Sequence, residues 1–225
     1  MISRDTVLSK IRRSLGVTGA ETERRAAVTD RLQRAPAGVI PKRGQVGRAE
    51  QQALFTDMAE KVQASVARVA SPADIPEAVA DYLRGRNLPL SLKMGSDERL
   101  NALPFAEKTP FLEIALGASD GGDLVGLSHA FAGIAETGTV VLESGPDNPS
   151  TLNFLPDTHI VVVRAQDIEG DYETMLAKVR DRYGKGVMPR TVNMITGPSR
   201  SGDIEQTLLL GAHGPRDLHI LVVGP

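Results

Sequence analysis

The amino-acid sequence predicts an α/β fold with a mostly parallel β-sheet that is covered by helices on both faces. From residue 65 onward, short apolar runs alternate with stretches of helical periodicity, which is the pattern of consecutive strand–helix–strand units. Residues 160–163 are all β-branched and show no polar alternation, as is typical of a strand buried on both faces. Strands are predicted at residues 65–70, 88–94, 111–116, 139–143, 159–164, 191–196 and 218–223.

The first 47 residues predict a helical arm followed by a linker. Apolar residues at positions 2, 7, 8, 11 and 15 fall on one helical face, and Gly16 can end this helix. Residues 22–34 predict a second, polar helix. Five Pro and Gly residues then follow between positions 36 and 47, which indicates a linker. We therefore divide the chain into an arm with its linker at 1–47 and an α/β domain at 48–225.

Within the α/β domain, the helices are predicted from periodicity and capping residues. Ser71 or Asp74 can cap a helix that runs to about residue 84. Asn148 is interpreted as a helix cap rather than as a pocket residue. Apolar residues at 123–134 and 139–143 flank a hairpin turn at 136–138. The other helices are predicted at residues 48–63, 96–103, 149–155, 167–182 and 203–210.

The composition excludes several classes of site. The 225 residues include no cysteine, so the chain has no disulfide, thiolate zinc site, cysteine nucleophile or cysteine-held iron–sulfur cluster. Aromatic residues make up only 4% and tryptophan is absent, which argues against a base-stacking surface for nucleic acid. None of the four histidines is spaced as a helical zinc motif, so we expect hydrogen-bonding histidines and no metal site.

The charge is distributed unevenly along the chain. Residues 1–50 carry 11 Lys and Arg against 5 Asp and Glu, whereas the remaining residues carry 15 against 23. We expect the basic arm to pack on its own acidic body or on a neighbouring subunit, in preference to nucleic acid or an anionic membrane. The start of the chain lacks the apolar run of a signal peptide, and the longest uncharged stretch is only 124–135. The sequence therefore predicts a cytoplasmic protein without a membrane span.

Familiar cofactor and hydrolase motifs are missing. The sequence contains neither the glycine fingerprint of dinucleotide-binding folds nor a Walker phosphate loop. Residues 197–201 come near to a nucleophile elbow, but Ser201 stands where that motif requires glycine. The sequence thus identifies no cofactor and argues against a serine hydrolase.

The first candidate site is the predicted hairpin turn around Glu136. A carboxylate at a tight turn between apolar strands can act as a general base or nucleophile when burial tunes its pKa. Glu136 is therefore a candidate catalytic residue, with Thr137, Gly138 and Thr139 as candidate ligand-binding residues. The alternative is that Thr137 and Gly138 only build the turn and that Glu136 is solvated.

The second candidate site is the segment 196–205, which follows a predicted strand and opens a predicted helix. Free backbone N–H groups, hydroxyls and a guanidinium can together bind a carboxylate, phosphate or sulfate. The alternative is a helix-capping loop, with Ser201 or Asp203 as the cap. The candidate ligand-binding residues here are Gly197, Ser199, Arg200, Asp203 and Glu205.

The third candidate is His213, which lies between two glycines in the segment 211–215 before the last strand. Glycine permits close approach of the backbone to a ligand, so His213 can face the ligand as an acid or base. The alternative is a turn with an ordinary hydrogen-bonding histidine.

Three segments resemble the lactate utilization protein C family, which is also called the YkgG-like or LUD-domain family. They are GIAETGTVVLESGP at 133–146, LPDTHIVVV at 155–163 and TGPSRSGDIEQTLLLGAHGPRDLHILVV at 196–223. The resemblance covers roughly residues 50–225. The family commonly has Thr-Ala where this chain has Ser201-Gly202, while the flanking residues agree.

The resemblance implies a three-layer α/β/α sandwich like that of the sugar-phosphate isomerase and CoA-transferase group. It also implies a role in L-lactate utilization, in which two iron–sulfur partner proteins take part in oxidising lactate to pyruvate. The resemblance itself assigns no chemical step to this chain. Within it, the segment 197–205 is the candidate for binding the lactate carboxylate or another small anion, and Glu136 and His213 are candidates for proton handling.

Two other functional classes stay open at this point. One is a stand-alone isomerase, acyl transferase or ligase that acts on a phosphorylated or carboxylated small molecule. The other is a ligand-binding regulator without catalysis. The basic arm can dock on iron–sulfur partners or mediate a homo-oligomer, and light scattering after deletion of residues 1–40 would separate these two roles.

Overall fold

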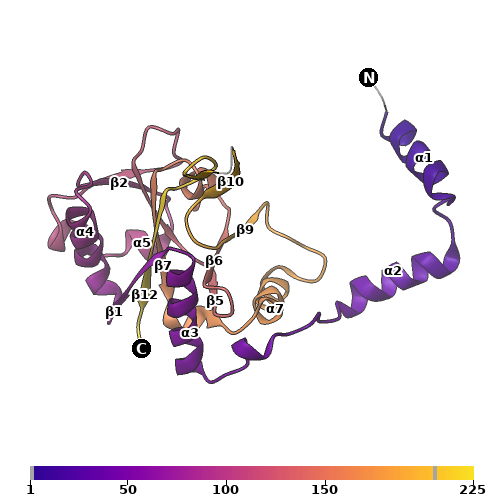
Figure 1. Cartoon of the computed structure of the whole chain (residues 1–225), viewed down its shortest axis with the longest axis horizontal. Coiled ribbons are helices and arrows are strands. Elements are labelled where there is room, and N and C mark those ends of the chain that lie inside the picture. The colour runs from indigo at the N-terminus through magenta and orange to yellow at the C-terminus, as the bar shows by residue number, and fades with distance from the viewer. Residues whose placement is uncertain (1–2, 205–206) are drawn as a thin grey trace.

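The computed structural model describes residues 3–204 and 207–225 and is built around a six-stranded sheet (Figure 1). The strand order is β1-β12-β7-β4-β2-β3, and all neighbouring strands are parallel. This confirms the predicted α/β fold with a mostly parallel sheet. The strands are β1 (Ser65–Val69), β2 (Ser91–Met94), β3 (Glu113–Leu116), β4 (Val125–His129), β7 (Thr158–Arg164) and β12 (Asp217–Val223).

A second sheet of four strands lies against the first. The sequence pattern predicted a single sheet and did not indicate that these strands form a separate one. Its order is β8-β5-β6-β9, and the β5–β6 and β6–β9 pairs are antiparallel. The predicted hairpin turn after residue 135 is confirmed, because it joins β5 to β6. The strands are β5 (Ala132–Ile134), β6 (Thr139–Glu143), β8 (Ile168–Glu169) and β9 (Val192–Ile195).

Helices cover the outer face of the parallel sheet. Alternate residues of β7 and β12 point to this side, where Ile160, Val162 and Leu221 pack against Val79 and Leu83. The same strands direct their other side chains into the core on the opposite face, which explains why the run 160–163 has no polar alternation. The covering helices are α4 (Ile75–Gly85), α5 (Glu98–Asn101) and α6 (Phe105–Lys108).

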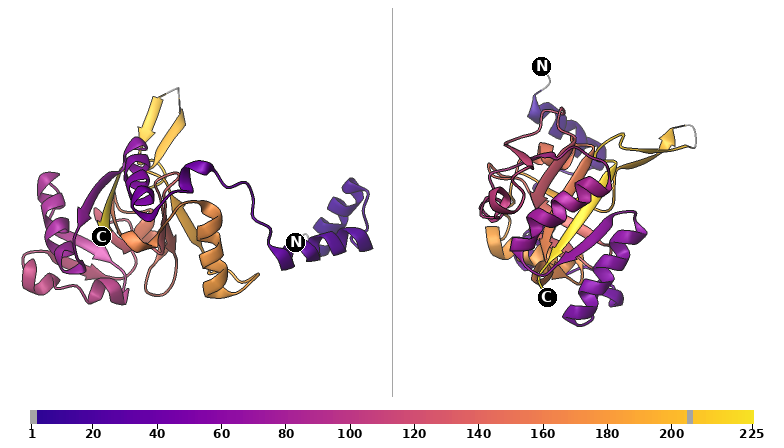
Figure 2. Two further views of the ribbon diagram at one scale, coloured as in Figure 1. Left: turned by 90° about the horizontal axis from the view of Figure 1, so that it is seen from below. Right: turned by 90° about the vertical axis from the view of Figure 1, so that its left-hand side faces the viewer.

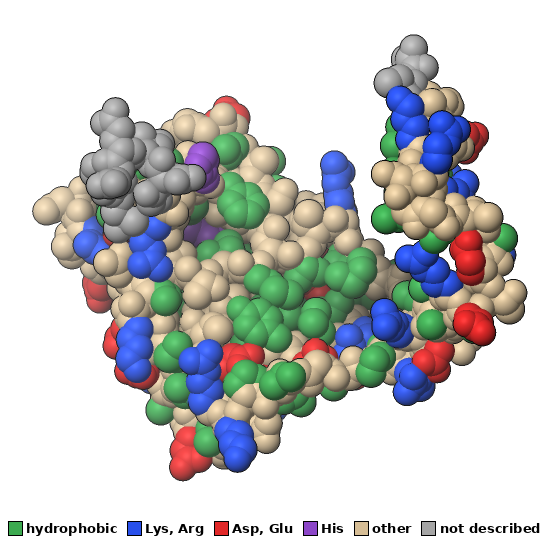
Figure 3. Space-filling view, turned by 45° about the vertical axis from the view of Figure 1, so that its right-hand side comes forward, with side chains coloured by type: hydrophobic (Ala, Val, Ile, Leu, Met, Phe, Trp, Pro, Cys, Tyr) green, Lys and Arg blue, Asp and Glu red, His purple; other side chains and the backbone are tan. Residues whose placement is uncertain are grey.

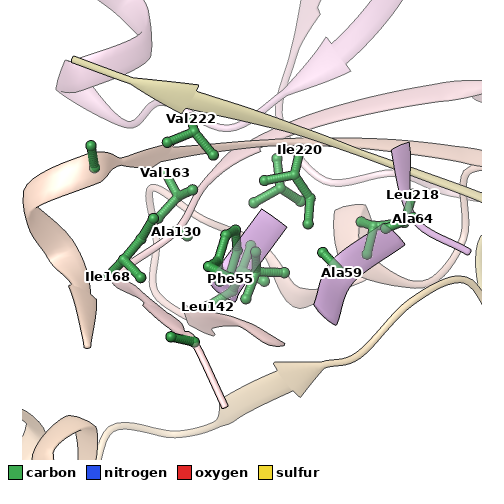
Figure 4. Close-up of a cluster of buried hydrophobic side chains, with 14 residues drawn as sticks. Phe55, Ala59, Ala64, Ala130, Leu142, Val163, Ile168, Leu218, Ile220 and Val222 are labelled. Carbon is green, nitrogen blue, oxygen red and sulfur yellow. The ribbon is translucent and has the colours of Figure 1, made fainter. Parts of the chain in front are cut away.

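The inner face of the parallel sheet is covered by α3 (Arg48–Lys61) and the four-stranded sheet. Phe55 of α3 is fully buried in this core together with Leu142 and Ile220 (Figure 4). The helix α7 (Tyr172–Tyr183) packs on the far side of the small sheet through Met175 and Val179. Four short 3₁₀ helices connect these elements: η1 (Lys42–Gly44), η2 (Pro72–Asp74), η3 (Ser150–Asn153) and η4 (Ala165–Asp167).

The helix predicted at 203–210 is wrong, because the chain forms an antiparallel hairpin there. The hairpin consists of β10 (Arg200–Ile204) and β11 (Thr207–Leu210), and it projects from the body (Figure 2). At its base, the Gly211 backbone N–H donates to the Ser199 carbonyl oxygen at 3.0 Å. This bond extends the ladder, so cross-strand pairing satisfies backbone groups that a helix would have satisfied locally. The capping role for Ser201 or Asp203 is therefore wrong as well.

The helix predicted at 167–182 begins later than expected. Residues 165–169 form η4 and β8, and α7 starts at Tyr172. Its true cap is Asp171, whose side chain accepts a hydrogen bond from the Thr174 backbone N–H at 2.9 Å.

The basic arm extends away from the body (Figures 1 and 2). It contains α1 (Arg4–Leu15), which ends at Gly16 as predicted, and α2 (Thr22–Arg34). Every residue of these helices is at least partly exposed, and both hydrophobic and basic side chains are visible on the arm surface (Figure 3). The end of the arm and the linker contact the body through hydrogen bonds from Lys185 to the Gln33 carbonyl and from the Gly38 N–H to Glu173. At Gly44 the backbone packs closely on the body, since an added Cβ would lie 2.1 Å from the Gly170 carbonyl oxygen. The division of the chain at residue 47 stays a prediction.

None of the helices in the described part of the chain combines the length and the apolar character that crossing a membrane requires.

Candidate functional site

A pocket of about 240 Å³ lies at the amino ends of β7 and β12. Its walls come from segments that are far apart in the chain: 153–154 at the end of η3, His159 of β7, 194–199 around the end of β9, and 213–215 before β12. We call it the histidine pocket. Ligands of open α/β sheets usually bind beyond the carboxyl ends of the strands, but this pocket lies at the opposite edge of the parallel sheet.

The floor of the histidine pocket is a buried hydrogen-bonded chain. His159 Nε2 lies 3.0 Å from Ser128 Oγ, and the Ser128 hydroxyl makes a long, 3.5 Å hydrogen bond to Asn153 Oδ1. Because the serine proton points to Asn153, the serine oxygen accepts from His159 Nε2–H. This arrangement assigns the free lone pair of the imidazole to Nδ1.

Two buried polar atoms of this floor have no hydrogen-bond partner among the described residues: His159 Nδ1 and Asn153 Nδ2. Both side chains are fully buried, and burial lowers the pKa of His159 to about 3. The imidazole is therefore neutral near pH 7. Because His159 and Asn153 line the pocket, these two atoms are candidates for accepting from and donating to a ligand there.

The rim of the pocket joins two of the predicted sites. The His213 backbone N–H donates to Ser199 Oγ at 3.3 Å, and the Ser199 backbone N–H donates to the Pro215 carbonyl oxygen at 2.8 Å. Gly197 has φ +72°, and an added Cβ would lie 2.3 Å from the Val62 carbonyl oxygen. Gly197, Ser199 and His213 thus come together at one pocket.

The remaining residues of the predicted anion site are placed differently. Arg200 begins β10, is exposed and does not line the pocket. Asp203 lies within β10, on the projecting hairpin, and Glu205 lies outside the described residues. The structure therefore divides the segment 196–205 between the pocket and the hairpin.

The turn around Glu136 forms a separate buried cluster. Glu136 is only 3% exposed, so the interpretation of a solvated carboxylate is wrong. Its Oε1 accepts from the Tyr172 backbone N–H at 3.1 Å, at the start of α7. Glu136 does not line the histidine pocket. Its catalytic role stays a prediction.

Hydroxyl groups connect this turn to the pocket. Thr139 Oγ1 lies 2.7 Å from both Thr137 Oγ1 and Thr196 Oγ1, and Tyr172 Oη lies 3.2 Å from both Thr137 Oγ1 and Thr139 Oγ1. Because Thr196 lines the pocket, Thr139 holds the pocket wall in position.

Sequence reasoning missed the polar floor of the pocket. His159 was grouped with ordinary hydrogen-bonding histidines, and Asn153 was not singled out. The available signal was weak: a histidine directly before the apolar run 160–163. Within the described ranges, no three His, Asp or Glu side chains are gathered as a metal-ligand set.

Comparisons with known proteins agree with the resemblance. The LUD domain model matches residues 123–223, the segment that contains every residue lining the histidine pocket. An uncharacterized protein from Neisseria meningitidis is 40% identical over 100 residues, which is 44% of this chain and 42% of that protein. Proteins named lactate utilization protein C from Geobacillus sp. and Bacillus subtilis are each 39% identical over 100 residues, again 44% of this chain and 42% of the relative. The matched segment thus spans less than half the length of these relatives.

The fold has a solved counterpart. A crystal structure of a DUF162 family protein from Deinococcus radiodurans superposes with a TM-score of 0.54 and 25% identity. The superposition covers 80% of this chain and 99% of that one. The family model and the relatives agree that residues 123–223 are similar to the LUD domain, with proteins named lactate utilization protein C among the relatives, and the solved structure agrees with the fold.

Proposed function

We propose that this chain serves lactate utilization by binding a small 2-hydroxy carboxylate, with lactate as the first candidate, in the histidine pocket. Several relatives carry the name lactate utilization protein C, which supports the biological role. The single observation that carries the ligand class is the pair of buried unpartnered atoms, His159 Nδ1 and Asn153 Nδ2.

A 2-hydroxy carboxylate supplies the partners that these two atoms lack. Its hydroxyl donates to the lone pair of His159 Nδ1, and its carboxylate accepts from Asn153 Nδ2–H. Each buried polar group without a partner destabilises the site by about 1–3 kcal/mol, so a ligand that satisfies both gains affinity. The volume of about 240 Å³ lies below the range of roughly 300–1,000 Å³ typical of larger organic ligands, which favours a small molecule.

The proposed part of this chain in lactate oxidation is to bind and orient the substrate. Conversion of lactate to pyruvate removes two electrons and two protons from the hydroxyl group and its carbon. This chain has no cysteine to hold an iron–sulfur cluster, so iron–sulfur partner proteins are our candidates for the electron acceptor. His213, exposed at the rim, is the candidate for passing the proton of the hydroxyl-bearing carbon to solvent. Glu136 is the second candidate for proton handling. It accepts from the Tyr172 backbone N–H, and the Tyr172 hydroxyl lies 3.2 Å from Thr139 Oγ1, which in turn contacts Thr196 of the pocket wall.

A His159→Gln variant is expected to bind L-lactate about tenfold more weakly in isothermal titration calorimetry. Glutamine keeps a polar group near the position of Nε2, facing Ser128, but removes the acceptor at Nδ1, and loss of one buried hydrogen bond is worth about 1.4 kcal/mol. His219→Gln is the matched control: it also replaces a buried histidine, but His219 contacts Tyr82 and Ser65, away from the pocket. Equal lactate affinity of wild type and His159→Gln would contradict the proposed pose.

The role in oxidation is tested by reconstitution with the candidate iron–sulfur partners. We expect L-lactate-dependent reduction of a dye to require this chain and to fall strongly with the His159→Gln variant. Full activity of the partners without this chain would overturn the oxidative role while leaving the calorimetric result on ligand binding intact.

A further inference from the structure

A second and larger cleft, of about 540 Å³, lies at the opposite edge of the parallel sheet. It is formed where β2 and β4 end, beside the end of β6 and the last turn of α7. In open α/β sheets the carboxyl ends of the strands are the usual place for ligands. We call it the carboxyl-edge cleft. It shares no lining residue with the histidine pocket, and the proposed function does not use it.

His129, the last residue of β4, offers a hydrogen-bond acceptor to this cleft. The side chain is 95% buried, and its Nδ1 lies 2.8 Å from the Ala130 carbonyl oxygen. A carbonyl can only accept, so Nδ1 carries the hydrogen and Nε2 carries the lone pair. Burial, reinforced by the nearby Arg99 charge, lowers the pKa of His129 to about 4, so the ring stays neutral near pH 7.

Glu143, the last residue of β6, offers a second acceptor. Its side chain is 9% exposed. Oε2 accepts from Tyr183 Oη at 2.9 Å and lies 3.2 Å from Arg182 Nη1, while Oε1 is buried with no partner in the part of the chain that the structure describes. A buried carboxylate oxygen without a hydrogen-bond donor is energetically unfavourable. A ligand that donates a hydrogen bond to this oxygen would therefore be bound favourably.

The charge balance of the cleft favours a cation. Its two guanidinium groups are already paired: Arg99 lies 2.5 Å from Asp97, and Arg182 pairs with Glu143. Two further carboxylates, those of Glu98 and Asp147, line the cleft and leave its charge negative. Asn148 lines it too, but its amide Nδ2 donates to the Glu143 carbonyl oxygen at 3.0 Å. The cleft therefore presents acceptors and negative charge, and an anionic ligand would be repelled.

We propose that the carboxyl-edge cleft binds a small organic molecule with a primary ammonium group, whose N–H donates to Glu143 Oε1. A second donor of the same molecule, such as a hydroxyl, donates to His129 Nε2. This ligand class is opposite in charge to the carboxylate proposed for the histidine pocket. Because the two sites share no lining residue, they are expected to act independently.

The test is a titration of the full-length protein with ethanolamine, followed by backbone amide NMR shifts. We expect saturable shifts at residues 97–99, 144, 145, 147 and 148, and much weaker ones with choline, whose quaternary nitrogen has no N–H donor. Glu143→Gln is expected to lower the affinity for ethanolamine about tenfold. Glu98→Gln removes the same charge at an exposed position and is expected to change the affinity no more than about twofold.

A second variant tests the same site independently of whether Glu143→Gln folds. His129→Asn keeps a donor near the position of Nδ1 but removes the Nε2 acceptor, and it is expected to weaken ethanolamine binding several-fold. L-lactate affinity is expected to be unchanged in both variants, which separates this proposal from the function proposed above. Absence of saturable shifts, equal binding of choline, or equal effects of Glu143→Gln and Glu98→Gln would each overturn the proposal.

Discussion

The free energy of unfolding is expected to fall steeply as the pH drops from about 6.5 to about 4. Three histidines are buried in the neutral form, and burial is the main cause of their lowered pKa values. The pKa is lowered to about 4 in His129 and His219 and to about 3 in His159. The ordinary value in an unfolded chain is about 6.5.

The decrease of the free energy of unfolding with falling pH follows from proton linkage. Between about pH 6.5 and the native pKa values, the unfolded chain binds protons that the native histidines do not, so acid stabilises the unfolded state. Each such histidine contributes a slope of about 1.4 kcal/mol per pH unit, and three contribute about 4 kcal/mol per pH unit. Since domains of this kind are stable by about 5–15 kcal/mol, mild acid is expected to unfold the protein.

Urea unfolding at a series of pH values between about 7.5 and 5 measures this slope directly. The variant His219→Gln should lower the slope by about one third, because it removes one of the three titrating groups and leaves both ligand sites in place. A free energy of unfolding that stays flat over this range would show that the native fold accommodates the charged imidazoles.

The parallel sheet could be predicted because its signals are local. The β-branched run 160–163 alone indicates a strand covered on both sides, and the two cores on either side of β7 agree with it. The second sheet depends on which apolar segments pair, and β6 pairs with β9, whose residues lie about 50 positions later. The hairpin 200–210 was missed for the same reason, since the backbone groups of this segment could equally have formed the local hydrogen bonds of a helix.

The sequence pattern indicated the rim of the histidine pocket but not its floor. Ser199 and His213 lie in glycine-containing loops, a pattern that indicates close backbone approach, and the structure brings them to one pocket. The floor needs Ser128, Asn153 and His159 in contact, although the three lie on separate elements. Whether a polar atom is buried without a hydrogen-bond partner depends on how distant segments pack, so no local sequence pattern could identify these atoms.

The substitution Gly138→Ala is expected to lower the free energy of unfolding by at least about 3 kcal/mol. Gly138 has φ +66°, a left-handed conformation that costs a residue with a side chain about 1–2 kcal/mol. An added Cβ would also lie 2.1 Å from the backbone nitrogen and 2.5 Å from the Cα of Ala59. These atoms belong to α3, whose Phe55 is fully buried. Removing the clash between the added Cβ and Ala59 therefore requires moving a helix that fills the core.

Gly121→Ala is the matched control for this substitution. Gly121 also has a positive φ, +96°, but an added Cβ would meet no atom within 4 Å among the described residues. It is expected to lower the free energy of unfolding by only about 1 kcal/mol, so the difference between the two variants in denaturant unfolding isolates the clash with α3. Equal losses would mean that α3 is not held rigidly against the turn. A larger loss in Gly138→Ala, accompanied by weaker L-lactate binding, would connect the packing of α3 to the ligand pocket through the Thr139–Thr196 hydrogen bond.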